Sequence, residues 1–358
     1  MTPTPPSRPI FCSVAAALVL LGLVACSGGH THAPAPVDDV YVAGYESTGI
    51  DMGGYIPNVA LSWTNGLKKP LSSDSNGSVA TAITVSAGDV YLAGQEGATV
   101  KYWKNGVGVA VTDGTQFAWT NAICVSGSDI YLGGGEGNVV KTWKNGVATA
   151  LTDGTAGGTV WGLAVSGGDV YAGGFVYGDV LIGPNSHLIN PVATIWKNGV
   201  ANPLTDGTHA AVVNAITLSE GWIYAAGFEA ADTVNGSAPY IAKYWKDGAP
   251  VVLTPVTLGA VACGITVVGP DVYVAGYEDN GKVVEAKYWK NGNPVRLTDG
   301  TRPSAALAIA VCGSDVYVSG SEDNGGAWVA KLWKNGVATA LTDGTQDAKA
   351  LALVAVRR

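Results

Sequence analysis

Residues 122–155, AICVSGSDIYLGGGEGNVVKTWKNGVATALTDGT, hold one complete copy of the pattern that decides the fold. Four short runs of apolar and small residues, at 122–126, 130–134, 139–143 and 147–152, are separated by glycine-containing turns. Such runs predict β-strands. The turn between the last two runs contains Asn145-Gly146. Both central residues of a type I′ turn need a positive φ, so this dipeptide is a strong hairpin signal. One copy therefore predicts four antiparallel strands.

The pattern recurs seven times along the chain. A tyrosine marks the second strand of each copy: Tyr41, Tyr91, Tyr131, Tyr171, Tyr224, Tyr273 and Tyr317. A tryptophan marks the third: Trp63, Trp103, Trp143, Trp196, Trp245, Trp289 and Trp333. Each tryptophan is followed 28 residues later by the next tyrosine in all six cases, so the length variation lies in one loop per copy. The array from Asp39 to Arg358 is therefore an integral seven copies.

These copies predict an all-β, seven-bladed β-propeller. The strands are apolar or small at nearly every position, which indicates burial on both faces. Four-stranded antiparallel units of this size, buried on both faces, are typical of propeller blades. The chain begins with a second strand and ends with a first strand at 350–356. We expect this C-terminal strand to complete the N-terminal blade, which closes the ring and hides two strand edges.

The Trp-Lys-Asn-Gly motif stands where the WD-repeat class carries Trp-Asp, and residues 39–358 resemble that class. The copies lack the Gly-His dipeptide of WD repeats, so the resemblance implies the architecture only. The tandem YVAG, WKNG and LTDGT motifs are also similar to repeats found in bacterial lipoproteins. That likeness implies no particular activity.

The N-terminus has the pattern of a targeting segment. Residues 14–25 are small or apolar, a run too short for a membrane span of about 20 residues but suited to a signal peptide. The run ends in Leu23-Val24-Ala25-Cys26, which resembles the lipobox of bacterial lipoproteins. The resemblance implies cleavage before Cys26 and lipidation of Cys26. The alternative is an ordinary signal peptide with a chance cysteine.

Three segments follow from these patterns. Residues 1–25 are expected to be a lipoprotein signal peptide, residues 26–38 a lipidated cysteine with a Gly/Pro tether, and residues 39–358 the propeller. In the resembled lipoproteins, a serine such as Ser27 after the lipidated cysteine implies transfer to the outer membrane. We therefore expect a lipid-anchored protein of the bacterial cell envelope, on its periplasmic or surface side.

The composition of the chain argues against some classes of partner and predicts the state of its cysteines. The chain has 50 glycines among 358 residues, 13% charged residues and a formal net charge of −8, which argues against a nucleic-acid partner. A glycine follows each repeat tyrosine by three residues, where we expect neighbouring blades to crowd near the axis. Three cysteines remain in the repeats, Cys124, Cys263 and Cys312. Their odd count predicts buried thiols without a disulfide framework, and no metal or cofactor is expected.

Two polar positions also repeat. Glutamate occurs five residues after the tyrosine in six copies, and lysine two residues before the tryptophan in five. We expect cross-strand ion pairs, with a cation-binding ring of carboxylates as the alternative. The aspartates of the Thr-Asp-Gly-Thr motifs are expected to form turns.

Residues outside the repeat mark a candidate site. In a propeller, the loops between second and third strands and the loops between blades share one face. Ten departures from the repeat fall on or near it: Phe117, Trp119, Trp161, Tyr177, Asp179, His187, His209, Asp232, Tyr240 and Trp328. Aromatic side chains on one face suit the stacking of sugars or peptides. The alternative is that Trp119 and Trp161 only fill the channel.

Function can be narrowed only to a class. We expect a monomeric, lipid-anchored propeller that binds an envelope protein or a glycan through this face, without catalysis. No common catalytic or phosphate-binding motif occurs in the sequence. The first alternative is a polysaccharide-acting enzyme with its site in the central funnel, for which Asp179 and Asp232 are the candidate carboxylates. The second is a structural subunit of an envelope assembly complex.

Overall fold

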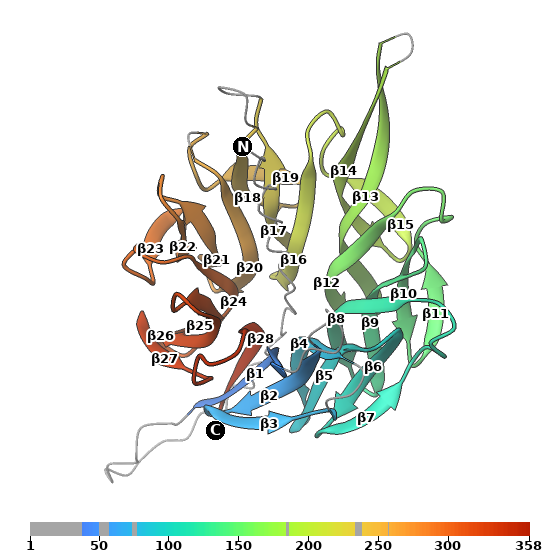
Figure 1. Cartoon of the computed structure of the whole chain (residues 1–358). Coiled ribbons are helices and arrows are strands. Elements are labelled where there is room, and N and C mark those ends of the chain that lie inside the picture. The colour runs from blue at the N-terminus through green and yellow to red at the C-terminus, as the bar shows by residue number, and fades with distance from the viewer. Residues whose placement is uncertain (1–37, 50–56, 74–76, 184–185, 233–237, 257) are drawn as a thin grey trace, which may run out of the picture.

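The computed structural model describes residues 38–49, 57–73, 77–183, 186–232, 238–256 and 258–358, with the backbone alone at 179–183 and 186–189. Seven four-stranded antiparallel sheets stand side by side in a ring (Figure 1). This arrangement confirms the predicted seven-bladed propeller. No helix long and apolar enough to cross a membrane occurs within these described ranges.

The strands of each blade run from the channel outward in chain order, and the C-terminal strand comes first in blade 1. Blade 1 contains β28 (Ala348–Arg357), β1 (Asp38–Ser47), β2 (Asn58–Thr64) and β3 (Leu67–Pro70). Blade 2 contains β4 (Ser78–Ser86), β5 (Asp89–Glu96), β6 (Thr99–Lys104) and β7 (Val107–Ala110). Blade 3 contains β8 (Ala118–Ser126), β9 (Asp129–Glu136), β10 (Val139–Lys144) and β11 (Val147–Ala150). Blade 4 contains β12 (Gly158–Ser166), β13 (Asp169–Gly183), β14 (Ser186–Lys197) and β15 (Val200–Pro203).

The remaining three blades follow the same order. Blade 5 contains β16 (Ala211–Ser219), β17 (Trp222–Ala230), β18 (Tyr240–Lys246) and β19 (Ala249–Val252). Blade 6 contains β20 (Ala260–Val268), β21 (Asp271–Asp279), β22 (Val284–Lys290) and β23 (Asn293–Arg296). Blade 7 contains β24 (Ser304–Cys312), β25 (Asp315–Asp323), β26 (Trp328–Lys334) and β27 (Val337–Ala340). The hairpin of β13 and β14 is the longest and projects from the ring (Figure 1).

The outer hairpins are type I′, as the Asn-Gly and Asp-Gly dipeptides predict. In all seven blades the Asn or Asp has a φ of 49–53° and the following glycine a φ of 79–86°. The asparagine side chain also ties this hairpin to the second strand. In blade 3, Asn145 accepts a hydrogen bond from the Ile130 backbone at 2.9 Å and donates one to Asp129 at 2.7 Å.

The seven repeat tryptophans are the largest side chains of the core, and each is 2% exposed or less. Trp63 of blade 1 donates its indole N–H to the Leu341 carbonyl of blade 7 at 3.1 Å. The tryptophans therefore pack between blades, and burying such a ring is among the largest single contributions to a core.

Every first strand contains a β-bulge at its fourth residue, which the sequence pattern did not predict. The bulge residues are Thr81, Asn121, Trp161, Asn214, Cys263, Leu307 and Leu351. Two residues before each bulge, the strand's carbonyl presses on the repeat glycine, so that a Cβ at Gly134 would overlap the carbonyl oxygen of Trp119. The glycine is thus required by a bulge within its own blade. The expected cause, crowding between blades, was wrong.

The ring closes through its chain ends. β1 pairs with β28 from Asp38 opposite Arg357 to Glu46 opposite Ala348, as expected. Arg357 contacts the Asp38 carboxylate at 3.3 Å, and Arg358 forms an ion pair with Asp39. The hydroxyl of Tyr317 in blade 7 also donates to Asp38 at 3.0 Å. The first and last described residues therefore hold each other in one blade.

Candidate functional site

The two ends of the ring differ in their connections. We call the end with the turns after the first and third strands the turn face. We call the other end, with the loops between second and third strands and between blades, the loop face. The described part of the chain begins at Asp38, at the turn-face end of β1, because Asp38 pairs with Arg357 at the end of a first strand. The candidate residues lie toward the loop face, although the side chains of Asp179 and His187 lie outside the described residues.

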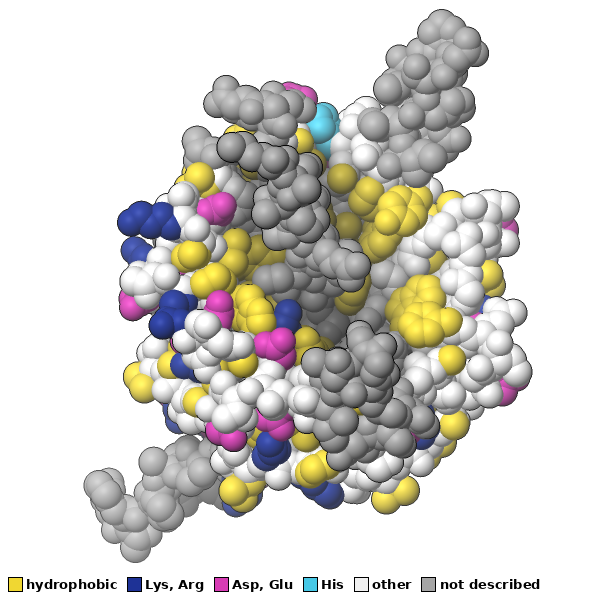
Figure 2. Space-filling view, viewed as in Figure 1, with side chains coloured by type: hydrophobic (Ala, Val, Ile, Leu, Met, Phe, Trp, Pro, Cys, Tyr) yellow, Lys and Arg dark blue, Asp and Glu magenta, His cyan; other side chains and the backbone are white. Residues whose placement is uncertain are grey.

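Four aromatic side chains of blades 3 and 4 form what we call the aromatic platform: Phe117, Trp119, Phe175 and Tyr177. Phe117 stacks on Trp119 with ring centroids 5.9 Å apart, and Tyr177 meets Phe175 edge-on at 5.4 Å. Phe117 is 56% exposed and Tyr177 45% exposed. Figure 2 looks onto this end of the molecule and shows hydrophobic side chains gathered beside the central hollow. Two apolar rings are thus available to a ligand.

A second departure from the repeat holds Trp119 in place. Its partner in the β8–β9 ladder is Gly135, and a Cβ there would fall 2.5 Å from the indole ring. The indole N–H donates to the Thr159 hydroxyl of blade 4 at 2.8 Å, and Thr159 pairs with Phe175. The indole is therefore fixed flat against one blade and hydrogen-bonded to the next. The extra glycine was a readable sign of this packing.

Trp161 has a different setting. It occupies the bulge of β12 and is half-buried. Bulge residues lie where first strands of neighbouring blades meet, since Asn121 donates to the Val160 carbonyl and Asn214 to the Ala262 carbonyl. Trp161 thus lies near the contact between first strands of neighbouring blades, whereas the platform residues lie toward the loop face.

His209 and Asp232 form a polar contact outside the repeat pattern. The loop before β16 carries His209, whose Nε2 lies 3.0 Å from a carboxylate oxygen of Asp232, at the end of β17. Its Nδ1 lies 3.1 Å from the hydroxyl of Thr208, which donates to Asp206 at 2.6 Å. Asp232 is 95% exposed, so water screens this pair. The sequence marked both residues separately but gave no sign that they meet.

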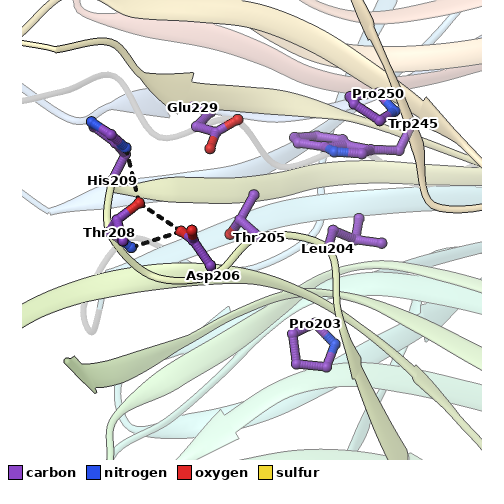
Figure 3. Close-up of a pocket in the computed structure, with 9 residues that line it drawn as sticks. All are labelled: Pro203, Leu204, Thr205, Asp206, Thr208, His209, Glu229, Trp245 and Pro250. Atoms are coloured by element: carbon purple, nitrogen blue, oxygen red, sulfur yellow. Dashed lines mark hydrogen bonds between the residues drawn. The ribbon is translucent and has the colours of Figure 1, made fainter.

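His209, Thr208 and Asp206 line a groove of about 630 Å³ between blades 4 and 5 (Figure 3). Asp206, Thr208, His209 and Glu229 line its polar end, and Pro203, Leu204, Trp245 and Pro250 its apolar end. An equivalent groove of about 460 Å³ lies between blades 2 and 3, with Gln116 in place of His209. The groove is therefore a repeat feature, and the histidine is its local variation. No group of three or more metal-ligating side chains occurs among the residues described.

The repeated acids behave as structural residues. Five glutamates pair with the predicted lysines: Glu96–Lys101, Glu136–Lys141, Glu229–Lys243, Glu278–Lys287 and Glu322–Lys331. Glu46 instead forms an ion pair with Lys68 of the outer strand β3. Each aspartate of the Thr-Asp-Gly-Thr turns accepts two hydrogen bonds from the threonine two residues on, as Asp153 does from Thr155. These bonds lower the pKa of Asp153.

Two further candidates lie apart from the platform. Tyr240 stacks on Phe228 at 4.4 Å in blade 5. In blade 7, Trp328 lies under the ammonium group of Lys349, whose Nζ is 5.2 Å from the ring centroid. Lys349 was not among the predicted site residues, because it lies within an otherwise apolar C-terminal strand.

The repeat cysteines are not alike. Cys124 is buried and Cys312 half-buried, and both are free. Burial raises the pKa of each thiol to about 11. Cys263 is disulfide-bonded, so the expectation of a thiol is wrong there.

No family model matches the chain, and no curated protein matches its sequence. The β-propeller domain of the Trilobed protease from Pyrococcus furiosus is 12% identical over 85% of this chain and 95% of that domain, with a TM-score of 0.49. Pyrococcus horikoshii acylaminoacyl peptidase is 12% identical over 85% of this chain, with a TM-score of 0.51. This chain spans 51% of the peptidase, and the likeness shows the propeller fold alone.

Proposed function

We propose that the chain is a binding lipoprotein of the bacterial cell envelope, anchored through Cys26, which holds a protein or glycan partner on its loop face without chemistry of its own. Cys26 and the signal peptide lie outside the described residues. The anchor therefore rests on the lipobox-like sequence. An outer-membrane location and a monomeric state are part of the same proposal.

The aromatic platform carries the binding role. The repeat explains the buried tryptophans and the ion pairs, but it does not explain an exposed Phe117 stacked on Trp119 in blade 3 or an exposed Tyr177 against Phe175 in the next blade. Exposed aromatic rings that stand together are the usual walls of sugar and peptide sites. The platform is also preformed, since Gly135 and Thr159 fix the indole, and preorganisation lowers the entropy cost of binding.

The path of the chain supports the proposed orientation. The described residues begin at the turn-face end of β1. A tether from Cys26 would enter the ring at that end, so the membrane would lie beyond the turn face. The loop face would then point away from the membrane, toward envelope partners.

Crosslinking and pull-down from intact cells test this function. In the variant, residues 177–191 of the long hairpin are replaced by the short loop of blade 3, Gly137-Asn138. This change removes Tyr177 and the projecting arm but keeps the four strands of blade 4. We expect the variant to reach the membrane fraction and melt like the wild type while losing its crosslinked partner. An unchanged set of partners would contradict the assignment of the loop face. Release of C26S from the membrane fraction tests the anchor separately.

A further inference from the structure

One positive charge stands out in the channel wall. Among the described lysines and arginines, five have no carboxylate within ion-pair distance: Lys69, Lys246, Lys282, Arg302 and Lys349. Four of them are exposed, and only Lys349 is half-buried. A cation withdrawn from water without a partner costs free energy. Among the described lysines and arginines, Lys349 is therefore the one whose position the fold does not explain.

The position of Lys349 is equivalent in all seven blades. It is the second residue of its first strand, where the other blades carry Val79, Trp119, Thr159, Val212, Val261 and Ala305. First strands contact one another around the ring, so they line the channel. The second residue lies near the loop-face end of each strand. Lys349 is thus the only charged residue among these seven equivalent positions, of which Thr159, Val212, Val261 and Ala305 are buried.

The surroundings of Lys349 are apolar and aromatic. Tyr45 pairs with it across the ladder, and Trp328 lies under its ammonium group. Leu351, in the same strand, belongs to an apolar cluster that Tyr45 and Val79 adjoin. Burial lowers the pKa of Lys349 and raises the pKa of Tyr45 to about 12. Both shifts follow from the partial burial of these two side chains.

The nearest carboxylate does not complete this site. Asp347 raises the pKa of Lys349, but it lies outside ion-pair distance and accepts a hydrogen bond from the Trp328 backbone at 2.8 Å. Asp347 is exposed, so water screens its charge. The ammonium group keeps donors for an incoming anion.

We propose that the mouth of the channel binds a glycan that carries an acidic group, with Lys349 as the partner of that group and Trp328 and Tyr45 as walls for the sugar ring. An aromatic ring offers a sugar an apolar face, and a lysine is a point charge that suits a carboxylate or a sulfate. This inference rests on the proposed function and names the ligand class of the same face.

Isothermal titration of the full-length chain with hexagalacturonate tests the inference, with its methyl ester as the uncharged match. We expect K349Q to weaken hexagalacturonate binding at least about tenfold, because a neutral amide cannot replace the charge-assisted hydrogen bond from the ammonium group to the acidic group. K349R should retain binding, and the exposed control K282Q should bind like the wild type. The ester should bind weakly to every variant alike. If the wild type binds dextran sulfate but not hexagalacturonate, and K349Q loses the dextran sulfate binding, the acidic group of the ligand is a sulfate.

Three results would overturn the inference. The first is equal hexagalacturonate binding by K349Q and the wild type, and the second is an ester that binds as tightly as the acid. The third is a melting temperature several degrees lower for K349Q, since that would make Lys349 a structural residue. If the wild type binds none of these glycans while crosslinking still captures a protein partner, the acidic glycan is rejected as the ligand and the proposed function stands.

Discussion

The turn face and the loop face are built from the same seven blades, and both carry repeated ion pairs or turns, but the departures from the repeat that mark the candidate site lie toward the loop face. On the turn face, a lysine after the repeat tryptophan pairs with the aspartate at the start of the second strand at 2.7–2.8 Å in five blades. On the loop face, loops of different lengths carry an aromatic platform, a His–Asp contact and a half-buried lysine. Regular residues hold the ring together, and the departures from the repeat are free to bind.

Removal of residues 348–358 should have the largest effect on stability. Without β28, blade 1 keeps three strands and exposes the edge of β1, so the ring cannot close. We expect loss of cooperative unfolding, measured by calorimetry. The double variant R357A/R358A keeps the ladder and should lower the melting temperature only slightly. A truncated chain that melts like the wild type would disprove closure by the C-terminal strand.

Gly134→Ala should have the next largest effect. Its Cβ would overlap the carbonyl oxygen of Trp119, and a backbone oxygen within a ladder cannot move away cheaply. We expect a loss of about 1–3 kcal/mol or more in the free energy of unfolding. Gly259→Ala is the matched control on the loop face, because a Cβ there meets nothing within 4 Å. Equal urea midpoints for the two variants would refute the role of the bulge.

Acid should destabilise the turn face through its aspartates. Hydrogen bonds from Lys144 and Asn145 lower the pKa of Asp129, and the same arrangement acts on Asp89, Asp169, Asp271 and Asp315. A carboxyl whose pKa is lower when folded stabilises the fold above its unfolded pKa of about 4 and loses this effect as the pH falls. We expect the melting temperature of the wild type to decrease at pH values below about 4. The melting temperature of D129N should decrease less steeply over the same range. If the melting temperatures of the wild type and D129N decreased in parallel with pH, the aspartates would not be the origin of the acid destabilisation.

Phe117→Ala should change stability least. More than half of the ring is exposed, and such surface changes usually stay within about 0.5 kcal/mol. The melting temperature should match the wild type while partner capture falls. If F117A instead melts several degrees lower, the platform belongs to the core and the contrast between the faces is weaker.

Much of the fold was predictable because its regular features recur, the Asn-Gly or Asp-Gly hairpin in seven blades and the Glu–Lys pair in five. The hairpins at Asn-Gly, the Glu–Lys pairs and the pairing of β28 with β1 all depend on neighbours at fixed spacing. The bulge was missed because the first strands are apolar or small at nearly every position, so a shift in strand register does not change the sequence pattern. Its one sign, the glycine after the tyrosine, has a second plausible cause in blade crowding.

From the sequence, the candidate site could be located only to one face of the propeller. Phe117, Trp119 and Tyr177 stood out as aromatic departures from the repeat, and the structure stacks Phe117 on Trp119 in blade 3 and sets Tyr177 against Phe175 in blade 4. The contact of His209 with Asp232 joins two loops whose lengths do not repeat, so sequence spacing could not reveal it. Lys349 escaped notice because single charges in strands usually face solvent. A comparison of the second residue in all seven first strands would have found it.

The most direct test compares one variant on each face in the same crosslinking experiment. The first variant, F117A/Y177A, removes exposed rings from the loop face, and the second, V107A/V147A/V337A, removes exposed valines from the turn face. Both should melt like the wild type, because all five side chains are mostly or substantially exposed. We expect the loop-face variant alone to lose its partner. Loss of the partner by the turn-face variant, with the loop-face variant unaffected, would contradict the division of the molecule into a structural face and a binding face.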